Sequence, residues 1–565
     1  MRRRADLLVG AAAAVLSLVV AALVLRLWHI DWHVPLDYTG DTVLNLTVIK
    51  TVMEHGWYLQ NPDLGFPHGQ ELYDYPVVSG ETLNLLFFRL AGLFTDDPVV
   101  VLNVFYVLTY PLTALTAYFV LRRVPLSREV SLVIALLYAW LPYHFLRGEV
   151  HVFLAAYYAV PLGAYLVLAV LRGDPLLGRW RPTLVTLALC AVVATASGSF
   201  YYAAFTVFLV AVAALLRFVA RGDRQALVAG GAVVAAITAV ALIQLAPTVV
   251  YHLRHGGNDE VAHRYWFESE TYSLKLTNLV LPIEHHRIGP IARARADYVQ
   301  QIPQSEGRVA SLGFVGAVGF LWLLGVALAA CFGAGRRFAL GLHGGLAALA
   351  LAAFLAATTG GLSVLFGVIW PQIRAWNRIS VFIAFFSLVA VGLLFEAARR
   401  RIPPPAFLVG LAVVLVVGAL DQTSPAYIPA YAAIEDGYRH DGALTRSVEA
   451  RLPGDAAVAQ VPYEPFPEPQ LNTPLGIYEP AKLYLQSEDL RWSWGAMRGR
   501  PADWMAAYAG KPAAEVVAAA RERGFRALLL DRAVLGAQAS AVEADYRNSL
   551  GEPTLSNDRY DLWRL

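Results

Sequence analysis

Charged residues and cysteines are both scarce in this 565-residue chain. Only 16% of its residues are charged, against about 25% in soluble proteins, whereas 57% are hydrophobic and the mean hydropathy is +0.50. The net charge of +2 is spread over short clusters, so nucleic acid is not expected as a partner. Cys190 and Cys331 each lie in an apolar run, which predicts neither a disulfide nor a cysteine metal site. The composition excludes an ordinary soluble enzyme and predicts an integral membrane protein.

Uncharged runs long enough to cross a bilayer recur throughout the first 421 residues. A helical crossing needs roughly 20 apolar residues, and by this measure the sequence predicts about eleven spans. One pair is predicted to be a hairpin that turns at residues 197–202, and the apolar stretch 362–373 is too short to cross, so we expect it to be re-entrant or interfacial. The predicted spans lie within 6–26, 97–122, 129–147, 149–172, 181–217 (two helices), 224–254, 308–336, 339–358, 379–394 and 401–421.

Arginine clusters flank these runs on one side only. Cytoplasmic loops are enriched in Lys and Arg, so this side is predicted to be cytoplasmic, with the N-terminus inside and the outer loops 28–97 and 251–310 outside. A cleaved signal peptide is the alternative for residues 1–27, but no small-x-small cleavage site follows. The clusters lie at Arg2, Arg122, Arg172, Arg217, Arg336 and Arg399.

Hydropathy falls after Asp421, where Pro, Asp, Glu and Arg become frequent. "AAVAQVPY" from Ala456 and "FRALLLD" from Phe525 are typical of strands, and "PAAEVVAAARERG" from Pro512 is typical of a helix closed by Gly524. The terminal "RYDLWRL" alternates apolar and polar residues and is predicted to be an edge strand. The chain therefore divides into a transmembrane domain, 1–421, and a soluble extracytoplasmic α/β domain, 422–565.

The first outer loop is rich in carboxylates, with Asp37, Asp41, Asp74 and Glu81 following the first span. Carboxylates close to a bilayer are costly to bury without a partner, which indicates a functional cluster. A solvated loop is the alternative, in which Asp41 would act as the N-cap of an interfacial helix that begins "DTVLNL".

Two further outer stretches combine ionisable side chains. "YHFLRGEVHVF" contains Arg147, Glu149 and His151 between two spans, where either a functional site or an ion-pair network that joins the helix ends is expected. "LPIEHHRIGP" contains His285, His286 and Arg287. Adjacent histidines point in different directions on most backbones, so a divalent metal site remains open but is not favoured.

Arg374 and Arg378 lie four residues apart at the predicted outer start of a span. If this segment is helical, both guanidinium groups share one face and suit a phosphate, because Arg offers bidentate hydrogen bonds and a permanent charge. Snorkelling to lipid headgroups is the alternative.

Together these stretches resemble, over nearly the whole chain, the GT-C class of polytopic membrane glycosyltransferases. The resemblance rests on "YTGDTVLN", "RGEVHVFLAAYYAVPL", the outer loop with "HHR" and the external α/β domain. It implies a bacterial inner-membrane enzyme of envelope glycan, glycolipid or lipopolysaccharide assembly that uses a polyprenyl phosphate or diphosphate sugar. The chain lacks the "WWD" motif of oligosaccharyltransferases, and Asp37 and Asp41 replace the adjacent acids of mannosyltransferases. Sugar and acceptor are therefore not specified.

The expected reaction is an inverting displacement in which Asp41 takes the proton of the acceptor hydroxyl and cations stabilise the departing phosphate. No cofactor motif is present. The alternatives are a lipid-linked glycan translocase, for which paired halves or broken helices are expected but no convincing repeat is found, and a non-catalytic assembly scaffold. Arg374, Arg378 and Arg287 are predicted to bind the donor phosphate, and Asp37, Asp74, Glu81, Glu149, His151, His285 and His286 to contact or shape the substrate site.

Overall fold

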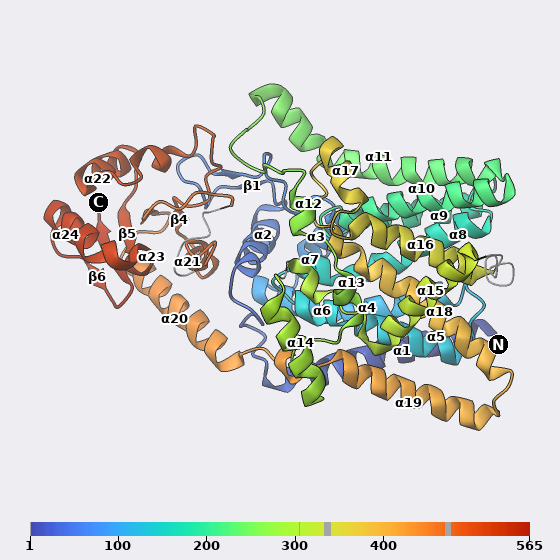
Figure 1. Ribbon diagram of the computed structural model, residues 1–565. Coiled ribbons are helices and arrows are strands. Elements are labelled where there is room, and N and C mark those ends of the chain that lie inside the picture. Colours follow the sequence, from blue (N-terminus) through green and yellow to red (C-terminus); the bar gives the residue numbers. More distant parts are fainter. Residues whose placement is uncertain (1, 304, 333–340, 469–475) are drawn as a thin grey trace.

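The computed structural model describes residues 2–303, 305–332, 341–468 and 476–565 and confirms the predicted fold class (Figure 1). Helices of membrane length form one bundle, and a small sheet lies at the C-terminal end of the chain. Nine helical segments within the described residues are long and apolar enough to cross a membrane. With two shorter apolar helices, Trp180–Thr195 and Leu342–Ala357, they match the prediction of about eleven spans.

The bundle helices follow the predicted runs closely. The predicted hairpin is confirmed, since one helix ends at Thr195 and the next begins at Tyr201. The run 129–147 is interrupted before Pro142, which has no N–H to donate and therefore begins a new helix. The bundle helices are α1 (Arg2–Leu25), α4 (Pro98–Leu121), α5 (Arg128–Ala139), α6 (Pro142–Arg147), α8 (Val160–Arg172), α9 (Trp180–Thr195), α10 (Tyr201–Arg221), α11 (Arg224–His255), α15 (Gly313–Cys331), α16 (Leu342–Ala357), α18 (Ser380–Arg399) and α19 (Pro404–Gln422).

The basic clusters gather at the end of the bundle that carries the N-terminus. Asp6 of α1 accepts hydrogen bonds from Arg122 (3.2 Å) and Arg128 (2.7 Å). Arg172 donates to the backbone carbonyl of Arg123 at 3.0 Å. The sheet lies at the opposite end (Figure 1). The predicted cluster at Arg336 lies outside the described residues.

Short helices cover the other end of the bundle. All residues of α2 from Thr42 to Met53 are buried, so this segment is an interior element and not the interfacial helix that the alternative interpretation of the loop predicted. α17 has eight residues, which is too short to cross a bilayer, as predicted. The elements here are α2 (Asp41–His55), α3 (Thr82–Ala91), α7 (Val152–Ala155), α12 (Glu268–Thr271), α13 (Leu276–Val280), α14 (Gly289–Gln301), α17 (Leu362–Ile369) and the hairpin of β1 (Gln60–Asn61) with β2 (Gln70–Glu71).

The C-terminal sheet has the strand order β4-β3-β5-β7-β6. β3 (Ala457–Val461) pairs in parallel with both β4 (Arg491–Trp492) and β5 (Ala527–Asp531), and α22 (Ala513–Glu522) connects toward β5, so the predicted strands and helix are confirmed. The predicted edge position of the last strand is wrong. β7 (Tyr560–Arg564) lies between β5 and β6 (Leu555–Ser556), and its first four residues are buried. The helices around the sheet are α20 (Tyr431–Glu449), α21 (Ala481–Leu485), α23 (Arg532–Leu535) and α24 (Ala539–Leu550).

The first outer loop packs directly against this sheet. Trp492 of β4 donates its backbone N–H to the carbonyl of Asp63 (2.7 Å), and the N–H of Phe66 donates to the carbonyl of Trp492 (3.0 Å). The loop thus extends the sheet beyond β4. The division of the chain into 1–421 and 422–565 remains a prediction, because these contacts cross it.

Candidate active site

Asp41 occupies the first position of α2. The residue before it, Gly40, is the N-cap, and no side chain caps the helix, so the alternative that Asp41 is an N-cap is wrong. Asp37 builds the preceding turn instead: its Oδ1 accepts hydrogen bonds from the backbone N–H of Thr39 (2.8 Å), its hydroxyl (2.8 Å) and the hydroxyl of Thr42 (3.0 Å). The Asp41 side chain is 41% exposed and has no capping duty, so it is accessible to a substrate.

His151, which directly precedes α7, is the nearest basic side chain to Asp41. Its Nε2 lies 3.6 Å from Oδ2 of Asp41. Burial, assisted by Arg147, lowers the pKa of His151 to about 3, so a neutral imidazole faces the carboxylate. Burial raises the pKa of Asp41 above its ordinary value; Arg378 opposes this shift and Glu306 adds to it. A more basic carboxylate is what a general base requires near neutral pH.

Two arginines share one glutamate beside Asp41. Glu306, in the turn that precedes α15, accepts a hydrogen bond from Arg378 (2.8 Å) and another from Arg147. Burial raises the pKa of Glu306, but the two guanidinium groups outweigh it and hold the pKa well below its ordinary value. The trio therefore carries one excess positive charge.

The arginines of this trio have hydrogen-bonding capacity to spare. Among the described residues, the buried Nε and Nη2 of Arg147 and the buried Nε of Arg378 have no hydrogen-bond partner. Excess cationic charge with free N–H donors suits an anion such as a phosphate. Glu306 was not predicted from the sequence, where the available signal was an acid two residues before the predicted span at Arg308.

Arg374 and Arg378 do not lie on one helical face as expected. α18 begins only at Ser380, and Arg378 belongs to the 3₁₀ turn Trp376–Ile379. Arg374 precedes that turn, pairs with Glu268 of α12 and lies over the ring of Tyr272, 5.0 Å from its centroid. The structure therefore brings Arg378, and not Arg374, into the trio with Glu306.

Three other predicted acids bind groups within the protein. Glu149 accepts hydrogen bonds from the backbone N–H groups of Leu36 (2.8 Å) and Asp37 (3.3 Å), and Glu81 accepts one from Ser199 (2.6 Å). Burial raises the pKa of both glutamates to about 8. The third acid, Asp74, accepts two hydrogen bonds of 2.6 Å from Arg500. The roles of all three as sugar contacts remain predictions.

The "HHR" segment contacts the C-terminal end of α19. His286 Nε2 lies 3.3 Å from Asp421, and Arg287 donates to the hydroxyl of Thr423 at 3.4 Å. The carbonyl of His285 accepts a hydrogen bond of 2.8 Å from Ser424. Within the described part of the chain, no hydrogen bond or ion pair joins these three residues to Asp41, so their proposed substrate contacts rest on the sequence alone.

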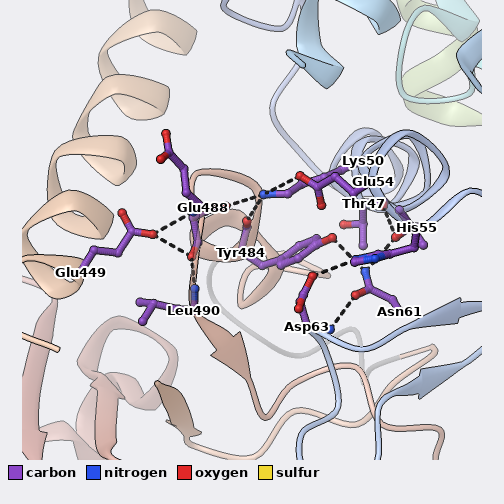
Figure 2. Close-up of polar contacts among 12 residues, drawn as sticks. Thr47, Lys50, Glu54, His55, Asn61, Asp63, Glu449, Tyr484, Glu488 and Leu490 are labelled. Carbon is purple, nitrogen blue, oxygen red and sulfur yellow. Dashed lines mark hydrogen bonds and ion pairs between the residues drawn. The ribbon is translucent and has the colours of Figure 1, made fainter. Parts of the chain in front are cut away.

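α2 is anchored to the C-terminal region by a buried lysine (Figure 2). Lys50 donates to the backbone carbonyls of Tyr484 (3.0 Å) and Ser487 (2.5 Å), at the C-terminal end of α21, where a cation is favoured. Asn61 adds hydrogen bonds of 2.8 Å to Thr51 of α2 and to the Tyr484 hydroxyl. The C-terminal region therefore helps to fix the helix that carries Asp41.

Glu54, His55 and Asp63 form a second group at the far end of α2. The ligand atoms of these three side chains lie within 4.8 Å of one another, which makes them the candidate metal-binding group among the described residues. Figure 2 shows that the group is already partnered: Lys50 lies 3.7 Å from Glu54, and His55 Nε2 lies 2.8 Å from Asp63. Lys50 supplies positive charge to Glu54 from outside the group.

Comparison with known proteins defines the class of fold. No family model matches the sequence, and no curated protein matches it. The chain superposes on the oligosaccharyltransferase of Archaeoglobus fulgidus in its apo form with a TM-score of 0.51 and 16% identity, covering 96% of this chain and 72% of that one. It matches the mycobacterial arabinofuranosyltransferase AftD with a TM-score of 0.48 and 16% identity, over 98% of this chain and 39% of that one.

The fold is therefore that of GT-C glycosyltransferases, as the sequence resemblance predicted. The protein is a multi-pass membrane protein with this fold.

Proposed function

We propose that this chain is a membrane glycosyltransferase that moves a sugar from a polyprenyl phosphate or diphosphate to an extracytoplasmic acceptor. The observation that supports it best is the pairing of an accessible carboxylate of raised pKa, Asp41, with the arginine trio. Displacement at an anomeric carbon needs a base for the incoming hydroxyl and cations for the leaving phosphate. Both lie here at one end of the bundle.

The location of the site supports a lipid-linked donor. Sugar nucleotides made in the cytoplasm are not normally available on the outer face of a bacterial inner membrane, the face on which the arginine pattern predicts Asp41 to lie. α17 exposes Leu365, Val368 and Ile369, an apolar surface that suits an isoprenoid tail a few residues before Arg374. Polar groups gathered at the membrane surface favour transfer over translocation, which is expected to use sites near mid-membrane.

The proposed step is a single displacement. Asp41 takes the proton of the acceptor hydroxyl. At the same time the oxygen of that hydroxyl forms a bond to the anomeric carbon of the donor sugar. The bond from that carbon to the phosphate oxygen breaks, and its electron pair stays on the phosphate, where Arg378 and Arg147 stabilise the charge. Attack opposite the leaving group inverts the anomeric centre.

Purified protein in lipid nanodiscs tests this proposal directly. Polyprenyl phosphate sugars, labelled in the sugar, should release labelled sugar to water or to an added acceptor and leave polyprenyl phosphate. Movement of intact donor across a vesicle bilayer without cleavage would support a translocase instead. If the protein neither cleaves nor moves any of the donors offered, the result would favour a non-catalytic scaffold.

The pH dependence of transfer should identify Asp41 as the base. Asp41 acts when ionised, so activity should fall as the pH drops through its pKa. Glu306 raises that pKa and Arg378 lowers it. Glu306→Gln should therefore move the acid limb of kcat to lower pH, and Arg378→Gln should move it to higher pH. An acid limb that stays in place in both variants would assign it to another group.

The orientation of the bundle is testable with fused reporters. A reporter that is active only outside the cytoplasm should be active after Leu565 and inactive after Arg123 or Arg400, because both arginines belong to the basic end of the bundle. Activity after Arg123 would place Asp41 on the cytoplasmic face and remove the argument for a lipid-linked donor.

A further inference from the structure

Two adjoining hollows border the first outer loop: one lies between this loop, the end of α11 and residues 497–502, and the other is lined by the loop itself. One has a volume of about 410 Å³ and the other about 550 Å³, and His68, Gly69 and Glu71 line both. We call them together the outer groove. Each volume falls in the range of roughly 300–1,000 Å³ that small-molecule sites occupy. The first is also lined by Tyr251 and Arg500, and the second by Trp57, Gln60, Gln70 and Tyr73.

Residues from three segments of the chain contact one another between the two hollows. The rings of Tyr73 and Tyr251 stack with centroids 4.6 Å apart and an interplanar angle of 10°. The Tyr251 hydroxyl donates to Glu71 at 2.9 Å, and Arg500 lies over the Tyr251 ring, 5.1 Å from its centroid. Because Asp74 holds Arg500 through two hydrogen bonds of 2.6 Å, the groove is largely formed before any ligand enters.

Gln70 packs into the wall of the larger hollow. Only 3% of the residue is exposed, and its Nε2 is buried without a hydrogen-bond partner among the described residues. A β-carbon on Gly495 would lie 2.8 Å from this nitrogen, so the amide packs against the backbone of Gly495. The loop and the C-terminal region are therefore in close contact on this side of the groove.

We propose that the outer groove binds a carbohydrate chain, the acceptor glycan of the transfer proposed above, on which this inference rests. A sugar presents many hydroxyl groups and one or two apolar C–H faces. The groove matches both: Gln60 and Glu71 offer an amide donor and oxygen acceptors, and the rings of Trp57 and Tyr73 offer flat apolar surfaces with polar edges.

The groove lies at a distance from Asp41 that suits a chain of sugars. α2 runs from Asp41 to His55, which borders the larger hollow, so its ends are about 21 Å apart at 1.5 Å per residue. The groove therefore holds sugars several units away from the reacting hydroxyl.

Binding of defined oligosaccharides to the purified full-length protein tests the groove. The probes are linear tetrasaccharides of mannose, glucose, galactose and arabinofuranose, with a random decapeptide pool as the alternative ligand. We expect at least one sugar series to bind and Trp57→Ala to weaken that binding tenfold or more. Trp32→Ala is the matched control, since Trp32 is a partly exposed tryptophan of the same loop that does not line the groove.

The outcomes separate this inference from the proposed function. Cleavage of the lipid-linked donor by water needs no acceptor, so Trp57→Ala should cleave the donor at the wild-type rate. Two outcomes would overturn only the assignment of the groove as a glycan site. One is donor cleavage without binding of any oligosaccharide, and the other is an equal loss of oligosaccharide binding in Trp57→Ala and Trp32→Ala. Binding of the peptide pool that depends on Trp57 would overturn the carbohydrate assignment. Absent donor cleavage would overturn the proposed function, on which the acceptor role depends.

Discussion

Asp41→Asn should bind the lipid-linked donor normally and transfer its sugar about 100 to 10,000 times more slowly, the usual contribution of a general base. An amide has the size of the carboxylate but cannot take up the acceptor proton near neutral pH. The fold should survive, because Asp41 is 41% exposed and makes no capping hydrogen bond to α2. Single-turnover transfer from a labelled polyprenyl phosphate sugar, with donor binding measured in parallel, gives both quantities.

Asp37→Asn is the matched control for this substitution. All three hydrogen bonds that Asp37 makes in its turn go to Oδ1, and the amide oxygen of Asn can accept the same three. We therefore expect a folded protein with a mild defect. Near-normal turnover in Asp41→Asn would remove Asp41 as the base, and a larger defect in Asp37→Asn would move that role to Asp37.

Loss of the Arg378 guanidinium should weaken donor binding most among the arginine variants. A charge-assisted hydrogen bond contributes about 1.5–3 kcal/mol, so Arg378→Gln should raise the Kd of the donor about 10- to 150-fold. Glu306 would still be paired with Arg147, which limits damage to the fold. Titration of the folded variant with polyprenyl phosphate, the product lipid, measures the phosphate contact without turnover.

Arg374→Gln provides the comparison. Arg374 pairs with Glu268 and lies over Tyr272, apart from the trio, so its loss should weaken donor binding less. If the variant with both substitutions binds the donor as well as Arg378→Gln does, Arg374 is not part of the phosphate site. Equal losses in the two single variants, with a greater loss in the double, would show that both arginines bind one phosphate, as their spacing in the sequence predicts. Unchanged affinity in all three would move the phosphate site elsewhere.

The sequence by itself determined the features that depend on local patterns. A span is a continuous apolar run, so it can be recognised without knowing any tertiary contact. The flanking arginines are equally local, and they give the predicted direction of the spans. The same holds for β3, α22 and β5, whose apolar periods are local. Asp41 stays a predicted base, singled out in the sequence because a carboxylate close to a bilayer is costly to bury without a partner. The edge position predicted for β7 was wrong, because alternation within a strand does not show which segment pairs with its second side.

Only the tertiary structure decided which of the polar residues meet. Arg147 and Glu306 are 159 residues apart, and Lys50 is 437 residues from Ser487, so no local spacing relates them. The spacing of Arg374 and Arg378 suggested one shared face, but each arginine pairs with a different distant glutamate. A buried charge must find an opposite charge or a hydrogen-bond partner wherever the fold places one. The trio beside Asp41, the anchoring of α2 by Lys50 and the walls of the outer groove all depend on such long-range pairing.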